Sequence, residues 1–546
     1  MLNYSNLAGR SFLKISFVAF LVFFRLAHGA PKIYYTDIVT GPNTGGENNL
    51  GAYLTLFGTG FGAAGVASQV TINNVPVAAV MQWTDTKLTV QPGPNVTSGV
   101  IGITVGTDTY SEPANSFTVV PGKIFFVALT GSDSSGQAGN ISRPFRRINA
   151  VFDSPRFGPG DHIVVRGGTW SDVYAQYGGF FSIHHKGGTA SAPMVIMGYP
   201  TETVLLNRTT QTRGIHSYDT PGHFVVANFH LNADGRGLGI GLAPGTSNVR
   251  VVNNELYGFF EDSGGSAVIA GSGKQLRILG NHVHDNGGSK LYHALYFDGR
   301  DTAGGGANDI EIAYNHIHHQ TGGRGIQIYG DTGTLISNVR VHHNLIHDIA
   351  LDGIILGRDS GTGFQVYNNV IYRTADPSLR GPSKDIGISG GCIRFDSPNL
   401  IAAVYNNTFA DCAVDDDPES AGIRFQKAMQ VTLVNNIISG KYYVNVGSMP
   451  ATFVSSHNLW FGKEAAPAWD THSISANPRF VNPSTGDFRL RASSPAIDRG
   501  SPSVNDVVAN DFDGVARPQG RAYDVGAFEF MRSAPSQRRE SAPQTQ

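Results

Sequence analysis

The sequence predicts an all-β protein in which a small β-sandwich precedes a long solenoid of stacked strands. The solenoid is predicted by a sequence motif that recurs along the chain: an alternating apolar run, an asparagine, one variable residue, then an aliphatic or aromatic residue. Its spacing of 22 to 38 residues is typical of units that bury their apolar faces only by stacking. The anchoring asparagines are Asn228, Asn254, Asn281, Asn315, Asn344, Asn369, Asn407, Asn436 and Asn458.

The composition fits a β-rich exported protein and argues against two kinds of partner. The chain has 546 residues, 68 glycines, 15% charged residues and a formal net charge of −2. This length exceeds one ordinary compact core, so an extended repeat domain with accessory parts is expected. Because basic residues are not in excess, we expect neither nucleic acid nor an anionic membrane as a partner.

The first 30 residues are typical of a secretory signal peptide. Arg10 and Lys14 precede an apolar run over residues 15–24, and small residues follow. That run is shorter than the ~20 residues that a membrane span needs. We therefore expect a secreted monomer, extracellular or periplasmic, whose mature chain starts near Pro31, with an uncleaved anchor as the alternative.

Residues 31–120 differ from the rest of the chain and predict the sandwich. Short alternating strands, such as residues 53–57, are bounded by Gly, Pro or Asn, as in immunoglobulin-like domains. The turn GTGFG at residues 58–62 and the run WTDTKLTV at residues 83–90 resemble the IPT/TIG family. That resemblance implies a spacer or binding module and brings no catalytic residue to this chain.

A second domain is predicted over residues 123–470. Its opening, with PFRRI at residues 144–148, resembles that of secreted β-helix proteins, in which this stretch begins a capping helix. Each later repeat divides into three strands, for example residues 353–357, 364–367 and 370–372. These features resemble the pectin lyase-like right-handed parallel β-helix family over about residues 160 to 460, in roughly ten coils. That fold hosts lyases, hydrolases, epimerases and non-catalytic adhesins.

Residues 471–530 are predicted to cap the β-helix, and residues 531–546 to form a disordered tail. The passages SPAIDRG at residues 494–500 and DVGAFE at residues 524–529 are similar to the C-terminal cap of bacterial secreted β-helix proteins. We expect this segment to close the open end of the stack, with its acidic turns serving structure. The tail is rich in Ser, Gln and Arg.

Aligning the first strands of successive repeats predicts which side chains face solvent, because alternate strand residues point to opposite sides. The outward columns are polar, and His293 and Arg324 occupy matching positions just before two strands, with Lys290 upstream. The inward columns are Leu295, Ile326, Ile354, Ile393 and Ile423, and Phe297, Ile328, Leu356, Phe395 and Phe425.

This polar face predicts an enzyme that binds an acidic polysaccharide and cleaves it by β-elimination. The reaction needs a cation at the uronate carboxylate, a base for the C5 proton and an acid for the leaving oxygen. We place Arg324 or Lys290 at the carboxylate, and His293 or Tyr296 as base and acid. The expected substrate-binding residues are Asp298, Gln327, Tyr329, Arg358, Arg394, Asp396 and Arg424.

Two other functions stay open. A glycoside hydrolase of the same fold would need two carboxyl groups about 5 to 9.5 Å apart, whereas Asp298 and Asp396 are separated by three coils. Asp301 and Asp331 lie in turns of adjacent coils and could form such a pair, or could hold Ca²⁺ together with Asp359. A carbohydrate-binding or surface protein would present the same polar face without cleaving anything.

The histidines and cysteines leave structural alternatives. The His-x-His strands at residues 282–284 and 316–318 have a spacing that could bind a transition metal. Their position explains them more simply, so we predict an outward stack of flat rings and assign no metal ligands. Cys392 and Cys412 could form one disulfide or remain two thiols. The predicted stack contains Tyr257, His284, His318, His347 and Tyr372, each three residues after an anchoring asparagine.

Overall fold

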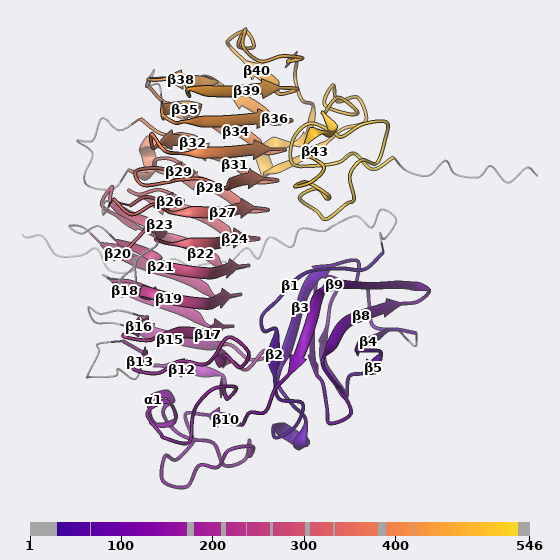
Figure 1. The fold of residues 1–546 in the computed structure, drawn as a ribbon, viewed down its shortest axis with the longest axis vertical. Helices are drawn as coiled ribbons and strands as arrows, with labels where there is room; N and C mark the ends of the chain where they lie inside the picture. The colour runs from indigo at the N-terminus through magenta and orange to yellow at the C-terminus, as the bar shows by residue number, and fades with distance from the viewer. Residues whose placement is uncertain are drawn as a thin grey trace, which may run out of the picture.

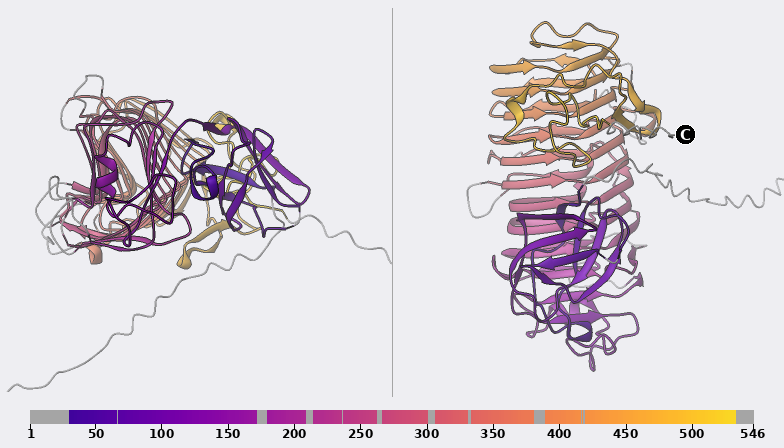
Figure 2. Two further views of the ribbon diagram at one scale, coloured as in Figure 1. Left: turned by 90° about the horizontal axis from the view of Figure 1, so that it is seen from below. Right: turned by 90° about the vertical axis from the view of Figure 1, so that its right-hand side faces the viewer.

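A β-sandwich and a C-terminal segment lie along one side of a long β-helix in the computed structural model (Figure 1). The right-hand view of Figure 2 shows the sandwich beside the lower coils and the C-terminal segment beside the upper ones. The expected signal peptide and nearly all of the expected tail lie outside the described residues. The structure describes residues 30–65, 67–171, 179–208, 214–235, 237–261, 266–300, 306–330, 333–380, 389–415, 417 and 419–532.

The predicted immunoglobulin-like sandwich is confirmed. Alternation along its strands places Leu56, Leu88 and Ile103 in the core between two sheets, where each is fully buried. One sheet contains β1 (Lys32–Thr36), β3 (Leu54–Thr59), β7 (Lys87–Gln91) and β6 (Ala79–Trp83). The other contains β2 (Thr40–Gly41), β9 (Asp108–Val119), β8 (Gly99–Val105), β4 (Gln69–Ile72) and β5 (Val75–Pro76).

The β-helix has three faces of parallel strands, and a complete coil contributes one strand to each face. The first face contains β13 (Phe181–His184), β16 (Ile215–Tyr218), β23 (Tyr292–Phe297), β26 (Ile326–Ile328), β29 (Ile354–Leu356), β32 (Gly391–Asp396), β35 (Ala421–Lys427) and β38 (Val444–Val446). Two long strands, β19 (Ile240–Val252) and β21 (Ser266–Leu279), run through the first and second faces and join them into one 20-stranded sheet.

The second and third faces complete each coil. The second contains β10 (Ile124–Val127), β11 (His162–Val165), β14 (Met194–Gly198), β17 (Gly222–Ala227), β24 (Asn308–Ala313), β27 (Ser337–His342), β30 (Phe364–Tyr367), β33 (Ile401–Tyr405), β36 (Gln430–Val434) and β39 (Thr452–Ser456). The third, of 12 strands, contains β12 (Gly168–Trp170), β15 (Val204–Arg208), β18 (His230–Gly235), β20 (Glu255–Glu261), β22 (His282–Gly288), β25 (His316–Thr321), β28 (Leu345–Ile349), β31 (Val370–Thr374), β34 (Thr408–Cys412), β37 (Ile437–Gly440), β40 (Leu459–Gly462) and β41 (Ile474–Ser475).

The interior of the coils is apolar, as the alignment of first strands predicts. Both inward columns of the first face are fully buried in one continuous core. Phe395 and Phe425 stack there on neighbouring coils, with ring centroids 5.3 Å apart. Burial of each such side chain contributes about 1.5–3 kcal/mol to folding. The strand alternation therefore also fixes which side chains of the first face point outward.

A buried ladder of asparagines marks the turn between the second and third faces. From Asn254 to Asn458, each Nδ2 donates to Oδ1 of the next asparagine at 2.9–3.1 Å. The same Oδ1 also accepts the backbone N–H of the preceding ladder residue, as Asn436 Oδ1 does from Asn407 at 2.9 Å. The left-handed conformation of the turn belongs to the residue before, for example Asn368 with φ of 51°. The residue before the ladder asparagine thus provides the turn conformation, and the ladder asparagine provides the hydrogen bonds between coils.

The register corrects the prediction for Asn228. Because His230 pairs with Glu255, Asn228 lies opposite Asn253 and the ladder position of that coil is Phe229. Asn228 has φ of 61°, and its amide donates to Asp37 Oδ2 of the sandwich at 3.2 Å. Sequence spacing could not separate the two positions, because asparagine occurs in both.

The N-terminal end of the stack is closed by a short helix, as predicted. Helix α1 (Ile148–Phe152) begins at the end of the PFRRI stretch and lies below the first coils in Figure 1. Phe152 is buried against Phe157 with ring centroids 5.6 Å apart, and both belong to the core of the β-helix. The helix therefore covers apolar side chains that the first coil would otherwise expose.

The C-terminal segment covers the side of the β-helix instead of closing its end, in contrast to our expectation. Its strands β42 (Phe480–Asn482) and β43 (Asp487–Leu490) lie beside the upper coils. Phe480, Phe488 and Val525 are buried with outward residues of β31, β34, β37 and β40, such as Ile437 and Leu459. Those outward positions are apolar and need cover, which explains the lateral placement.

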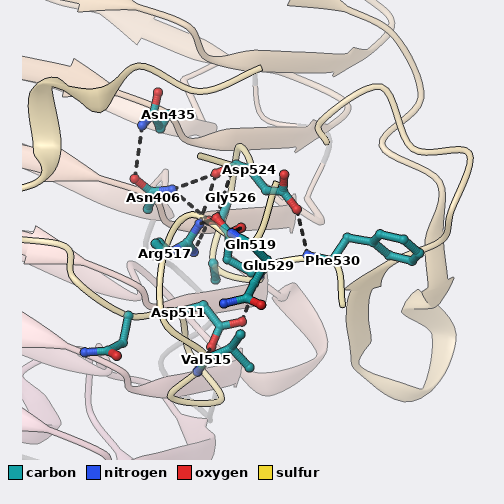
Figure 3. A network of polar contacts seen from close by, with 12 residues as sticks. Asn406, Asn435, Asp511, Val515, Arg517, Gln519, Asp524, Gly526, Glu529 and Phe530 are labelled. Carbon is teal, nitrogen blue, oxygen red and sulfur yellow. Dashed lines mark hydrogen bonds and ion pairs between the residues drawn. The ribbon is translucent and has the colours of Figure 1, made fainter. Parts of the chain in front are cut away.

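A polar network holds this segment in place (Figure 3). Arg517 and Glu529 form a fully buried ion pair at 2.8 Å. Asn406, a turn residue of the β-helix, donates to the carbonyl oxygens of Asp524 and Gly526 at 2.9 and 3.1 Å. The Asp524 carboxylate accepts the backbone N–H of Phe530 at 2.6 Å. The acidic turns therefore satisfy backbone groups, as the sequence predicts.

The sandwich shares a core with the second face of the β-helix. Val195, Val225 and Leu279 point outward from that face and are buried together with sandwich residues. Tyr34 also stacks on Tyr314 of the β-helix, with ring centroids 5.3 Å apart. The Tyr34 hydroxyl donates to the carbonyl oxygen of Asp513 at 2.5 Å, so the sandwich also touches the C-terminal segment. The domain is thus anchored to the β-helix.

Two smaller features complete the fold. Cys392 on β32 and Cys412 on β34 form a disulfide with a Cα–Cα distance of 5.4 Å, which decides between the two alternatives left by the sequence. Among the described residues, no helix has the length and apolar character needed to cross a membrane.

Asn407→Ala is predicted to destabilise the protein by about 2–4 kcal/mol, because it leaves buried groups on two neighbouring coils without a partner. The measurement is the free energy of unfolding in denaturant. Asn505→Ala is the control, since Asn505 is exposed at the surface, and it should change stability by less than about 0.5 kcal/mol. Equal losses of unfolding free energy in the two variants would contradict a stabilising contribution of the asparagine ladder.

Glu311 on β24 is predicted to make the free energy of unfolding depend on pH in the acidic range. Burial alone would raise its pKa, but the hydrogen bond with His342 and the charges of Arg340 and Arg277 lower the pKa to about 2. Because folding lowers the pKa of Glu311, its carboxylate stabilises the fold at pH values above its ordinary pKa of 4.5. This contribution is lost as the pH falls from about 4.5 to 2. Glu311→Gln should therefore cost up to about 3 kcal/mol at pH 7, and the gap to wild type should shrink below pH 4.5. A gap that stays constant with pH would contradict this.

Candidate functional site

Four of the predicted site residues meet on the outer side of the first face. Strand β23 pairs with β26 so that Tyr296 lies opposite Gln327, which also sets His293 opposite Arg324. The Arg324 Nη1 donates to Gln327 Oε1 at 2.9 Å. The rings of His293 and Tyr296 have centroids 6.0 Å apart. The predicted alignment of these side chains is therefore the one that the coils adopt.

His293 is buried and held as a neutral ring. Burial, followed by the nearby charge of Arg324, lowers the pKa of His293 well below its ordinary value. Its Nδ1 accepts the backbone N–H of Arg324 at 3.2 Å. In a neutral imidazole the proton then resides on Nε2, which can donate but not accept. This arrangement disfavours His293 as a base, and Tyr296 beside it is half-buried at the surface.

A buried carboxylate that sequence reasoning missed organises the cations of this face. Asp352 is fully buried and accepts Arg324 Nε at 2.9 Å and Arg424 Nη1 at 3.3 Å. Arg424 also donates to the carbonyl oxygen of Ser389 at 2.7 Å. Its side chain passes Gly391, where an added Cβ would come within 3.2 Å of Arg424 Cδ. The group of two guanidiniums and one carboxylate carries a net charge of +1.

A positional signal could have revealed Asp352. It immediately precedes the strand Gly-Ile-Ile-Leu, in the column of His293 and Arg324. The prediction that Arg424 binds substrate is corrected by the same contacts, because its side chain is only 4% exposed. An alternating pattern places Arg424 outward, but it cannot show that the guanidinium turns back toward a charge two coils away.

The remaining predicted residues differ in their exposure. Asp298 is also corrected as a substrate ligand, because its side chain is 2% exposed and pairs with Arg300 at 2.5 Å. Arg394 and Asp396 form a half-exposed pair at 2.5 Å. The guanidinium of Arg358 lies 5.7 Å from the ring centroid of Tyr329. Lys290 and Arg358 are exposed, so they present positive charge at the surface of this face.

The possible Ca²⁺ ligands are only partly within the described residues. Asp301 and Asp331 lie outside them. Asp359 Oδ2 accepts the backbone N–H of Gly333 at 2.9 Å, which is the behaviour of a turn aspartate.

The predicted stack of rings on the third face is confirmed. Tyr257, His284, His318, His347 and Tyr372 follow one another with ring centroids 4.7–5.3 Å apart and planes within 15° of parallel. A cleft of about 480 Å³ lies further along this side, between β34, β37 and the C-terminal segment, and includes Asp411 and Arg479. None of the predicted catalytic residues lines that cleft.

Two family descriptions match this sequence. The family model described as a right handed beta helix region matches residues 212–371 and 293–466. The model described as an IPT/TIG domain matches residues 36–119. The chain is a right-handed β-helix protein with an N-terminal TIG domain. The stack of parallel strands and the sandwich described above are the structural counterparts of these two matches.

Several solved structures resemble this β-helix protein at low similarity. Pectate lyase Pel9A is 14% identical, with a TM-score of 0.48, over 75% of this chain and 96% of its own. XylC in complex with xylose is 11% identical, with a TM-score of 0.44, over 75% and 99%. The GH136 lacto-N-biosidase from Eubacterium ramulus is 14% identical, with a TM-score of 0.40, over 65% and 67%. These values are too low to carry an activity to this chain. A comparison with curated proteins found no match.

Asp352→Asn is predicted to cost about 3–5 kcal/mol, because it leaves two buried guanidiniums without their carboxylate. The matched control is Asp396→Asn, which breaks a half-exposed pair on the same face and should cost no more than about 1 kcal/mol. Denaturant unfolding of both variants measures the difference. Similar losses of unfolding free energy in the two variants would show that burial of the Asp352 ion pairs does not increase their contribution to stability.

Proposed function

We propose that the protein degrades an acidic polysaccharide by β-elimination on the outer side of the first face. One observation carries the proposal. Tyr296 lies opposite Gln327, whose amide oxygen is hydrogen-bonded to Arg324, so a phenol, an amide and a guanidinium share one place on two adjacent coils. A proton-transfer group beside a positioned cation is what elimination next to a uronate requires.

Tyr296 is the proton-transfer residue in this proposal. As the phenolate it removes the C5 proton of the uronate, the electron pair forms the C4–C5 double bond, and the glycosidic oxygen leaves. The phenol then returns the same proton to that oxygen, so no net proton is consumed. The +1 charge of the Arg324, Asp352 and Arg424 group stabilises the developing enolate in this proposal.

The surrounding residues position the reaction and the chain of sugars. His293 supports the ring of Tyr296 from the buried side. Exposed Lys290 and Arg358 attract the acidic substrate, and Tyr329 offers a ring along the same face. Each coil advances ~4.8 Å along the β-helix, so successive sugars can lie over successive strands. Secretion, predicted from the first 30 residues, would bring the enzyme to such a substrate.

A substrate screen tests the proposal against the two alternatives. The full chain is incubated with polygalacturonate, alginate, glycosaminoglycans and neutral glycans, while ultraviolet absorbance of the unsaturated uronate and new reducing ends are recorded. Elimination produces both signals. New reducing ends without absorbance would indicate a hydrolase with paired carboxylates, and binding without new ends would indicate a non-catalytic protein.

Tyr296→Phe is predicted to lower kcat by about 10²–10⁴-fold, since it removes the proton-transfer hydroxyl, and to leave KM nearly unchanged. Tyr218→Phe is the matched control, because Tyr218 is an exposed tyrosine three coils earlier on the same face. Initial rates of absorbance increase provide the measurement. Full activity of Tyr296→Phe would remove this residue from the mechanism.

A further inference from the structure

A cluster of histidines on the outer side of the third face brings ring nitrogens closer together than stacking requires. His282 and His284 lie on β22 and His318 on β25. Strand register sets His284 directly opposite His318, whereas His282 is diagonal to it. Nε2 of His282 nevertheless lies 2.8 Å from Nε2 of His318, and the two rings are tilted by 41°. Parallel stacking accounts for the column of rings but not for this approach.

These three histidines form a group with the spacing of metal ligands. One ligand nitrogen from each ring fits within 4.8 Å of the other two, and all three side chains are partly exposed. Among the residues that the structure describes, this is the one group of three or more His, Cys, Asp or Glu residues with that property. An ion could therefore reach the group from solvent without opening the fold.

Two of the rings direct their other nitrogen to a partner that fixes the ring's orientation. Nδ1 of His284 lies 2.8 Å from Asp285 Oδ2. Nδ1 of His318 lies 2.6 Å from Nδ1 of His319. Metal-binding histidines are usually held in this way, because a hydrogen bond at one nitrogen leaves the lone pair of the other for the metal.

Glu255, one coil earlier on β20, completes the group with a negative charge. Its Oε1 lies 3.2 Å from His284 Nε2 and 3.6 Å from His282 Nδ1. A carboxylate beside the His282 and His284 rings offsets part of the charge of a divalent ion.

We propose that His282, His284 and His318 bind one Zn²⁺ or similar transition-metal ion through one nitrogen of each ring. Two nitrogens on one tetrahedral zinc lie about 3.3 Å apart when each Zn–N distance is about 2.0–2.1 Å. The His282 and His318 rings therefore need to separate by only about half an ångström. The ion joins two adjacent coils, and its site lies on a different face from the proposed reaction and is independent of it. This departs from the sequence interpretation, which assigned no metal ligands.

The first test measures binding by the full chain, purified without a histidine tag and dialysed against a chelator. Calorimetric titration with Zn²⁺ is expected to show one saturable site per chain, and Co²⁺ is expected to give the visible absorption of a tetrahedral site. His318→Gln should lower Zn²⁺ affinity at least about 100-fold and abolish the Co²⁺ bands.

His347→Gln is the matched control, because His347 is the next ring of the same stack, with its plane within 3° of His318. This variant loses a stacked imidazole but no ligand, so it should keep both signals. A wild-type chain without saturable binding, or equal losses in His347→Gln and His318→Gln, would overturn the proposal.

A second readout protects the test against misfolded variants. Zn²⁺ is expected to raise the Tm of the wild type and of His347→Gln, and to leave the Tm of His318→Gln and His284→Gln unchanged. An equal rise in all four would place the ion elsewhere. Anomalous diffraction from wild-type crystals grown with Zn²⁺ needs no variant. A peak between the three rings supports the site, and a peak elsewhere excludes it.

Discussion

The buried asparagine ladder is the constraint on which the rest of the structure depends. Each ladder amide joins two coils, and its oxygen also accepts a backbone N–H from the coil before. Removing one amide would leave buried polar groups unpaired on both coils, so the turn must recur at one place. Repeat lengths vary from 22 to 38 residues without shifting the strands, because the extra chain is placed in loops away from the ladder.

The ladder fixes three faces, and what covers each face decides where chemistry can take place. The sandwich covers the early second face with a shared apolar core. The C-terminal segment covers the apolar columns of the late third face. The first face and the early third face carry polar side chains instead. One of them holds the cations around Asp352, and the other holds the imidazoles around Glu255. The two proposed sites thus occupy the polar surfaces that the added segments leave.

The sequence was sufficient wherever a contact follows from strand alternation and repeat spacing. Register brought His293 opposite Arg324 and Tyr296 opposite Gln327, as alignment of the repeats predicts. The stack from Tyr257 to Tyr372 followed from the same spacing. Strand alternation does not predict a contact where a side chain leaves its column. Arg424 turns back across Gly391 to Asp352, and His282 tilts diagonally toward His318.

The sequence by itself determined the repeat and the inward columns, because these depend on local periodicity, and its resemblance to the IPT/TIG family identified the N-terminal domain. Only the tertiary structure decided that Asn228 serves the turn, that the C-terminal segment covers a flank, and that Cys392 pairs with Cys412. It also decided which outward charges are available, since the side chains of Asp298 and Arg424 are themselves buried and paired. The physical reason is that a charged side chain pairs with a group that is close in space, on another coil. The sequence separation between the two is not set by the repeat period.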